Sequence, residues 1–332
     1  MPDIQHPEGE ALRDEDSAPR TDAPSGQTFL DAPLVTDWRD LNADAVVFGV
    51  PYGRPYIPAS FPDDQSCAPA ALRAASSRIL ISDQSVDTDF KTNNQAGDVK
   101  IVDGGNIPLT GRNFDAHYTA AENAVRFALG RGVMPIIIGG NDGVTNPVIK
   151  GLDCLDDITL IQIDAHMDWA DQRYGISDGY SSPMRRASEL PHISGIHQIG
   201  IRSFGSATAS DMDDARRWGS HIHLARDIDR AGMSSVIDAL PSSGKFFVTL
   251  DVDGMDPSVM PGTVAKAPGG LSWWHMIDLF EGLTSKGDVM GLNLVEMAPS
   301  NDLNQITMIG AGRLAMKLIM LQNIKNRHKP GR

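Results

Sequence analysis

The sequence is poor in cysteine and in positive charge, and it contains no long apolar run. Cys67 and Cys154 are its 2 cysteines among 332 residues, so a disulfide framework is excluded and a reducing compartment is expected. The absence of about 18 consecutive apolar residues excludes a membrane-spanning helix. The N-terminal segment has neither a basic start nor an apolar core, so we expect no secretory signal and a cytoplasmic protein.

Acidic residues outnumber basic ones. The chain has 43 Asp and Glu against 29 Lys and Arg, which gives a formal net charge of −14. Such a field repels a nucleic-acid backbone and an anionic membrane surface, so neither is expected as a partner. A small cationic ligand would instead be attracted.

The composition changes near both ends of the chain. Residues 1–28 are rich in Asp, Glu, Pro, Ser and Gly, and we expect them to form a mobile tail or an arm that docks on a neighbouring subunit. Residues 29–326 contain no internal linker and are predicted to form a single domain, followed by a short tail at 327–332. A domain of this length can bury a sizeable core.

Short apolar runs alternate with longer helical patterns throughout the predicted domain. The candidate strands are residues 43–50, 98–104, 133–140, 158–164, 196–202, 221–224, 245–251 and 289–296. Several runs are apolar without alternation, which is typical of strands covered on both faces. The pattern predicts an α/β fold with a mainly parallel sheet of about eight strands. In such a sheet, ligands bind beyond the carboxyl ends of the strands.

Carboxylates gather at those carboxyl ends. Together with one histidine, the candidates are Asp142, Asp164, His166, Asp168, Asp251, Asp253, Asp256 and Glu296. Residues two apart in an extended segment share a face, and carboxylates packed so closely repel one another unless a cation neutralises them. Oxygen ligands with some imidazole favour Mn²⁺, with Ni²⁺ or Fe²⁺ as alternatives, and the number of carboxylates suggests two ions that share a bridging Asp. We expect Asp256, which precedes Pro257, to cap a turn instead of binding metal.

These segments resemble the ureohydrolase family, which includes arginase, agmatinase and related amidinohydrolases. DAHMD (164–168) resembles the DAHxD motif, and TLDVDGMDPSVMPGTVAKAPGGLS (249–272) resembles the family's long aspartate-rich signature. VEMAP (295–299), QIGIRS (198–203) and CAPAALR (67–73) are similar to three shorter family segments. The likeness runs from about residue 43 to the last predicted helix, and its overall pattern is closest to the agmatinase branch.

The resemblance implies a three-layer α/β/α arginase-like fold and a homotrimer or homohexamer. It implies hydrolysis of a guanidino group by water activated at a binuclear metal site, which yields urea and an amine. The positions that match metal ligands are Asp142, Asp164, His166, Asp168, Asp251 and Asp253, with Asp164 and Asp251 in bridging positions. Glu296 matches the carboxylate that binds the guanidinium group, a role that suits a planar cation with N–H donors. Asp168 is a candidate proton shuttle.

Three positions depart from the family pattern. Asp142 occupies a ligand position that is usually His, which makes the ligand set more negative and opposes formation of hydroxide from a bound water. Tyr180 stands where the family has an active-site His, and a tyrosine is a poor base at neutral pH. Arginases have Asn at the position of Ala170, so we expect a substrate without an amino-acid head. Trp169 could stack on that substrate or could pack in the core.

The leading hypothesis is a metal-dependent amidinohydrolase. Its substrate would be agmatine, a guanidino acid, guanidine, or an alkylated guanidine or biguanide. The alternative is a catalytically degenerate subunit that stabilises an active paralogue in a hetero-oligomer, as in metformin-hydrolase-like members of the family. The residues Asp142, Gly143 and Tyr180, at three positions that the family usually fills otherwise, motivate that alternative, whereas the dense carboxylate cluster favours the enzyme.

Overall fold

The computed structural model describes residues 17–79, 86–89, 94–95, 99–205 and 207–327. Its centre is a parallel sheet of eight strands, as expected from the sequence. From one edge to the other the sheet runs through β4 (Ile101–Asn106), β1 (Ala45–Val50), β5 (Met134–Gly139), β10 (Asp288–Val295), β9 (Lys245–Asp251), β6 (Ile158–Ile163), β7 (Ile193–Ile201) and β8 (His221–Leu224). Two short strands, β2 (Val86–Asp87) and β3 (Asn94–Gln95), form a separate antiparallel pair.

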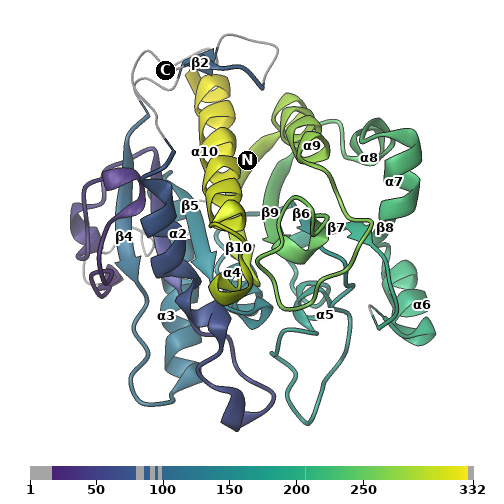
Figure 1. Cartoon of the computed structure of the whole chain (residues 1–332), viewed down its shortest axis with the longest axis horizontal. Coiled ribbons are helices and arrows are strands. Elements are labelled where there is room, and N and C mark those ends of the chain that lie inside the picture. Colours follow the sequence, from purple (N-terminus) through teal and green to yellow (C-terminus); the bar gives the residue numbers. More distant parts are fainter. Residues whose placement is uncertain (1–16, 80–85, 90–93, 96–98, 206, 328–332) are drawn as a thin grey trace, which may run out of the picture.

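Helices cover both faces of the sheet and complete a three-layer arrangement (Figure 1). One face carries α2 (Ala68–Ser76), α7 (Ala225–Ala231), α8 (Ser234–Ala239), α9 (Trp273–Lys286) and α10 (Ile306–Arg327). The other carries α3 (Phe114–Gly130), α4 (Thr145–Lys150), α5 (Pro183–Ala187) and α6 (Ala209–Trp218). The predicted α/β/α architecture is therefore confirmed.

The strands are apolar on both sides because each side faces a helical layer. In β5, Ile136 and Ile138 join the core beneath α2, α9 and α10, whereas Ile137 joins the core on the opposite face. Successive side chains of a strand point to opposite faces, so most positions of a strand that is buried on both faces are apolar. This explains the continuous apolar runs in the sequence.

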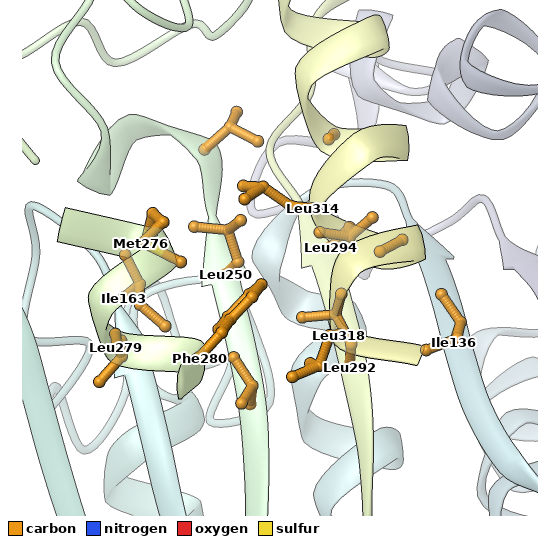
Figure 2. Packing of buried hydrophobic residues seen from close by; sticks show 14 of the residues in the cluster. Ile136, Ile163, Leu250, Met276, Leu279, Phe280, Leu292, Leu294, Leu314 and Leu318 are labelled. Atoms are coloured by element: carbon orange, nitrogen blue, oxygen red, sulfur yellow. The ribbon is translucent and has the colours of Figure 1, made fainter. Parts of the chain in front are cut away.

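The longest helix lies over the middle of the sheet. Leu314 and Leu318 of α10 approach Leu292 and Leu294 of β10, and Phe280 of α9 lies over the neighbouring strand β9 (Figure 2). Complete burial of a Leu or Phe side chain contributes about 1.5–3 kcal/mol. The core therefore holds rigid the four central strands whose ends carry the candidate site.

The first residues that the structure describes contact the edge of the sheet. Asp22 and Asn106 at the end of β4 exchange two backbone hydrogen bonds of 2.8 Å, and the Thr21 N–H donates to the Thr36 carbonyl at 3.0 Å. This part of the predicted N-terminal tail thus packs on its own domain, because backbone pairing with an edge strand needs no apolar pattern. Residues 1–16 and 328–332 lie outside the described residues, and the remaining domain assignment stays a prediction.

None of the helices in the described part of the chain is long and apolar enough to cross a membrane.

Candidate metal centre

The predicted site residues follow four strands that are neighbours in the sheet, in the order β5, β10, β9 and β6. Asp142 begins a short 3₁₀ helix, η6 (Asp142–Val144), just after β5, and Glu296 directly follows β10. Asp251 ends β9 and precedes a second 3₁₀ helix, η7 (Val252–Gly254), while Asp164 directly follows β6. Because parallel strands end at the same edge, segments far apart in the sequence converge there.

The acidic and imidazole side chains form two groups that share Asp164. One group contains Asp164, His166 and Asp253, and the other contains Asp142, Asp164 and Asp168. Within each group, one ligand atom per residue lies within 4.8 Å of the others. Two groups with one carboxylate in common suit a pair of divalent ions that share a bridging ligand. The bridging role expected for Asp251 stays a prediction.

Hydrogen bonds fix the two aspartate-rich loops against each other. The His166 Nδ1 atom lies 3.1 Å from Asp253 Oδ2 and 3.4 Å from Asp164 Oδ1. The Ala165 N–H donates to Asp253 Oδ1 at 3.1 Å, and the Asp253 N–H donates to Asp251 Oδ1 at 2.8 Å. The two-residue spacing in both motifs thus lets the backbone of one loop orient carboxylates from both loops.

The pKa values of these groups reflect a cluster of like charges away from water. Burial raises the pKa of Asp142, Asp168 and Asp251 well above the ordinary value, and repulsion from neighbouring carboxylates adds to this effect. Burial also acts on Asp164, but hydrogen bonding and charge attraction from His166 lower its pKa overall. Hydrogen bonds to Asp164 and Asp253 raise the pKa of His166 to about 10. A divalent cation would relieve the repulsion, so the donor set fits a metal centre.

Glu296 is positioned from two sides. Its Oε1 accepts a hydrogen bond of 2.8 Å from the Asp142 N–H, and its Oε2 accepts one of 2.8 Å from Gln65 Nε2. Burial of the carboxyl raises its pKa to about 7. The sequence motifs do not identify Gln65, which lies in η5 (Asp64–Cys67) just before α2. The available signal is that Gln65 nearly adjoins the CAPAALR segment (67–73), but a single glutamine is not typical of any catalytic or metal-binding motif.

Two of the site residues have strained backbones. Asp168 has φ 47° and Glu296 has φ 61°, in a backbone region that residues other than glycine rarely adopt. Each such residue costs about 1–3 kcal/mol and persists where the surrounding structure enforces it. Here the strain directs both carboxylates toward the same cavity.

A cavity of about 620 Å³ opens at this edge of the sheet. Its wall includes most predicted site residues, namely Asp142, His166, Asp168, Trp169, Tyr180, Asp251, Asp253 and Glu296. Asp164 is only 1 % exposed and is not part of the wall. The volume is sufficient for a small organic substrate.

Trp169 and Tyr180 occupy different positions in that wall. Trp169 is 2 % exposed, its indole N–H donates to Asp214 at 2.9 Å, and its ring packs at 6.1 Å from Trp218. These contacts make Trp169 mainly a core residue, and its predicted stacking on substrate stays a prediction. Tyr180 is 38 % exposed and packs on Tyr56 with ring centroids 4.3 Å apart. Tyr180 is therefore a partly exposed residue of the cavity wall.

Asp256 caps a turn, as expected. Its Oδ2 accepts hydrogen bonds from the N–H groups of Gly269 at 2.7 Å and Gly270 at 3.1 Å. The residue thereby fastens the loop after η7 and belongs to neither group of candidate ligands.

Comparisons with known proteins agree with the motifs. The model of the Arginase family matches residues 43–321. The chain is 27% identical to the agmatinase of Bacillus subtilis over 301 residues, which cover 90% of this chain and 97% of that protein. It is 26% identical to the guanidinobutyrase of Pseudomonas aeruginosa over 308 residues, 90% of this chain and 93% of that protein.

Among solved structures, the proclavaminate amidino hydrolase of Streptomyces clavuligerus superimposes with a TM-score of 0.76. The sequences are 25% identical, and the match covers 90% of this chain and 97% of that chain. The hypothesis of a degenerate, non-catalytic subunit finds no support in these relatives, each of which is named as an enzyme.

Proposed function

The chain belongs to the Arginase family, and on this premise we propose that it hydrolyses the guanidino group of a small compound other than arginine. The family relationship makes it an enzyme of the metal-dependent amidinohydrolase type, within a family whose members use a binuclear metal site. The observation that carries the proposal is the pair of ligand groups that share Asp164, because the other four members of these groups all line one cavity.

Two divalent ions are proposed to bind at these groups. The residues that would hold them are Asp142, Asp164, His166, Asp168, Asp251 and Asp253. Carboxylate oxygens with one imidazole favour Mn²⁺, with Ni²⁺ as the alternative. When bound, such ions would neutralise the carboxylates and would lower the pKa of a bound water molecule.

Glu296 is proposed to bind the guanidinium group of the substrate. Its two oxygens are already oriented by Gln65 and by the backbone of Asp142, so its remaining lone pairs face a fixed direction. A guanidinium cation presents parallel N–H donors that match a carboxylate. Ala170 lines the cavity and offers no polar group to an amino-acid head, which supports agmatine, a guanidino acid or a simple guanidine over arginine.

Asp168 is proposed to carry the proton that the reaction requires. The new C–O bond forms between water and the guanidinium carbon, and the C–N bond to the amine breaks. The leaving amine needs a proton, and Asp168 is a carboxyl in the cavity wall that can take a proton from the attacking water and pass it on to the amine. Gln162 Nε2 donates to Asp168 Oδ2 at 3.2 Å and holds the carboxyl in place. The Tyr180 hydroxyl is a candidate hydrogen-bond donor to the substrate.

Urea release tests the proposal. The purified protein, supplied with Mn²⁺ or Ni²⁺, is assayed with agmatine, 4-guanidinobutyrate, guanidine and arginine. We expect urea from at least one of the first three and little from arginine. Asp251→Ala should lose both tightly bound metal and urea release, whereas Asp213→Ala, at a carboxylate 66% exposed on α6, should behave as the wild type. Undiminished urea release by Asp251→Ala would refute the proposed mechanism.

Assembly is a separate part of the proposal. A homotrimer or homohexamer remains our expectation, with a hetero-oligomer containing a paralogous subunit as the alternative. Light scattering on the protein purified alone distinguishes an assembled chain from one that needs a partner.

A further inference from the structure

Arg202 is a half-buried cation immediately after β7. Its guanidinium donates hydrogen bonds to the backbone carbonyls of Gly200 (3.0 Å), Asp253 (2.6 Å), Gly254 (3.2 Å), Met255 (3.2 Å) and Ala267 (3.0 Å). Arginine usually forms paired bonds with carboxylates, so a guanidinium directed at carbonyl oxygens acts as a cross-link between backbone segments.

The cross-link joins the loops that carry one of the two candidate metal groups. Three of its acceptors belong to consecutive residues from Asp253 onward, so the guanidinium holds the carbonyls of that turn together. The backbone N–H of Arg202 also donates to the Ala165 carbonyl at 3.0 Å, and Ala165 lies between Asp164 and His166. The side chain of Arg202 therefore fastens the backbone at Asp253, while its backbone pairs with the residue between Asp164 and His166.

The side-chain contacts of Arg202 reach only one of the two candidate groups, through the carbonyl of Asp253. The other group, which adds Asp142 and Asp168 to Asp164, receives no hydrogen bond from the Arg202 side chain.

We propose that Arg202 is a positioning residue for one of the two metal positions. Its side chain holds the turn at Asp253, so that this carboxylate faces the ion shared with Asp164 and His166. Asp142 and Asp168, the other two members of the second group, receive none of its side-chain hydrogen bonds. This inference rests on the proposed binuclear centre, and it adds that one of the two metal positions depends on Arg202 more than the other does.

Binding of Mn²⁺ alone tests the proposal without any substrate. Titration calorimetry of the metal-free wild type should give two ions per chain, and electron paramagnetic resonance should give the signal of a coupled pair. For Arg202→Gln we expect one Mn²⁺ bound with wild-type affinity and the other about 10- to 100-fold more weakly, with a mononuclear signal. Arg202→Lys keeps the positive charge, and it should restore part of the affinity for the Mn²⁺ ion that Arg202→Gln binds more weakly.

Arg126→Gln is the matched control. Arg126 is an arginine on α3 that binds Asp153 and Glu122 by its side chain, and its replacement should leave both Mn²⁺ affinities unchanged. The inference is overturned if Arg202→Gln binds two ions as the wild type does. It is also overturned if both ions weaken equally while the melting temperature of the metal-free protein falls, because that result indicates a general structural role. If the wild type binds two ions but releases no urea, the proposed function is refuted. The role of Arg202 would still stand if Arg202→Gln then weakened only one of the two ions.

Discussion

At the residue scale, the orientation of the Glu296 carboxyl group depends on an uncharged neighbour, Gln65, that is neither a candidate metal ligand nor a candidate catalytic residue. Gln65 donates to Oε2 at 2.8 Å and is 8 % exposed. Loss of a hydrogen bond to a buried charged group costs about 1–3 kcal/mol. The orientation of the guanidinium-binding carboxylate should therefore depend on Gln65, although Gln65 belongs to neither candidate metal group.

Gln65→Leu distinguishes an effect on substrate binding from an effect on metal binding. We expect kcat/KM for the best guanidino substrate to fall about 10- to 100-fold, mainly through a higher KM, because the substrate-binding carboxylate loses one of its two supports. Metal content should remain that of the wild type. Gln27→Leu, at an exposed glutamine, is the control and should change neither quantity. A wild-type KM in Gln65→Leu would show that Glu296 is oriented without this contact.

Individual residues could be predicted where they belong to dense motifs. The ligand candidates after β6 and β9 were recognisable because aspartates two apart share a face, and the structure brings both motifs together. Gln65 and the carbonyl contacts of Arg202 could not be predicted in this way. Both residues matter because of contacts that only the fold creates. Gln65 contacts Glu296, which is 231 positions away in the sequence, and Arg202 contacts Asp253, which is 51 positions away.

At the scale of elements, the site depends on how closely η7 approaches the end of β6. A Cβ added at Gly254 would lie 2.6 Å from the Asp164 backbone nitrogen and 2.8 Å from the Ile163 carbonyl carbon. Backbone atoms cannot move aside as a flexible side chain can. The absence of a side chain at Gly254 thus lets the loops that carry Asp164 and Asp253 lie side by side.

Gly254→Ala should therefore disturb the metal centre and the fold together. We expect a melting temperature lowered by several degrees and weaker binding of Mn²⁺ by the group of Asp164, His166 and Asp253, because η7 must move away from Asp164. Calorimetry measures both quantities. Gly195→Ala is the control, since an added Cβ there would meet nothing closer than 3.5 Å from Thr159. Equal behaviour of the two variants would contradict the close approach.

The strands of the sheet can be predicted from their apolar runs, but some short helices cannot. All eight strands lie near the positions that the sequence predicts. Helices α4 and α7 have 6 and 7 residues, and no clear periodic pattern distinguishes them in the sequence. The lateral order of the strands, which makes β5, β10, β9 and β6 neighbours, depends on long-range pairing that periodicity does not reveal.

At the scale of the whole molecule, buried titratable groups make stability depend on pH in two opposite directions. Burial lowers the pKa of His197 to about 3 and of His223 to about 4, from an ordinary 6.5. The stability that depends on their neutral forms is complete above about pH 6.5 and is lost as the pH falls through these values. Burial instead raises the pKa of Glu296 to about 7 from 4.5. Its contribution in the metal-free protein is present below its ordinary pKa and is lost as the pH rises through about 7.

The metal-free protein should therefore become less stable between about pH 6.5 and about pH 8, where the contributions of His197 and His223 no longer change. The raised pKa of His166 acts in the same direction as that of Glu296 over this range. We expect the melting temperature to fall over this range after chelation, and the fall to be smaller in Glu296→Gln. Bound Mn²⁺ should remove the fall, because the ions compensate the ionised carboxylates and bind only the folded state. Differential scanning calorimetry provides the measurement. A melting temperature that rises with pH in the metal-free protein would contradict the raised pKa values.

The metal content of the chain purified alone tests the binuclear centre most directly. The protein is expressed with Mn²⁺ and, separately, with Ni²⁺, and the ions per chain are counted by inductively coupled plasma mass spectrometry. The two ligand groups that share Asp164 predict about two ions per chain under at least one condition. A content near zero under both conditions would mean that Asp142 does not replace the usual histidine, and it would contradict the proposed function.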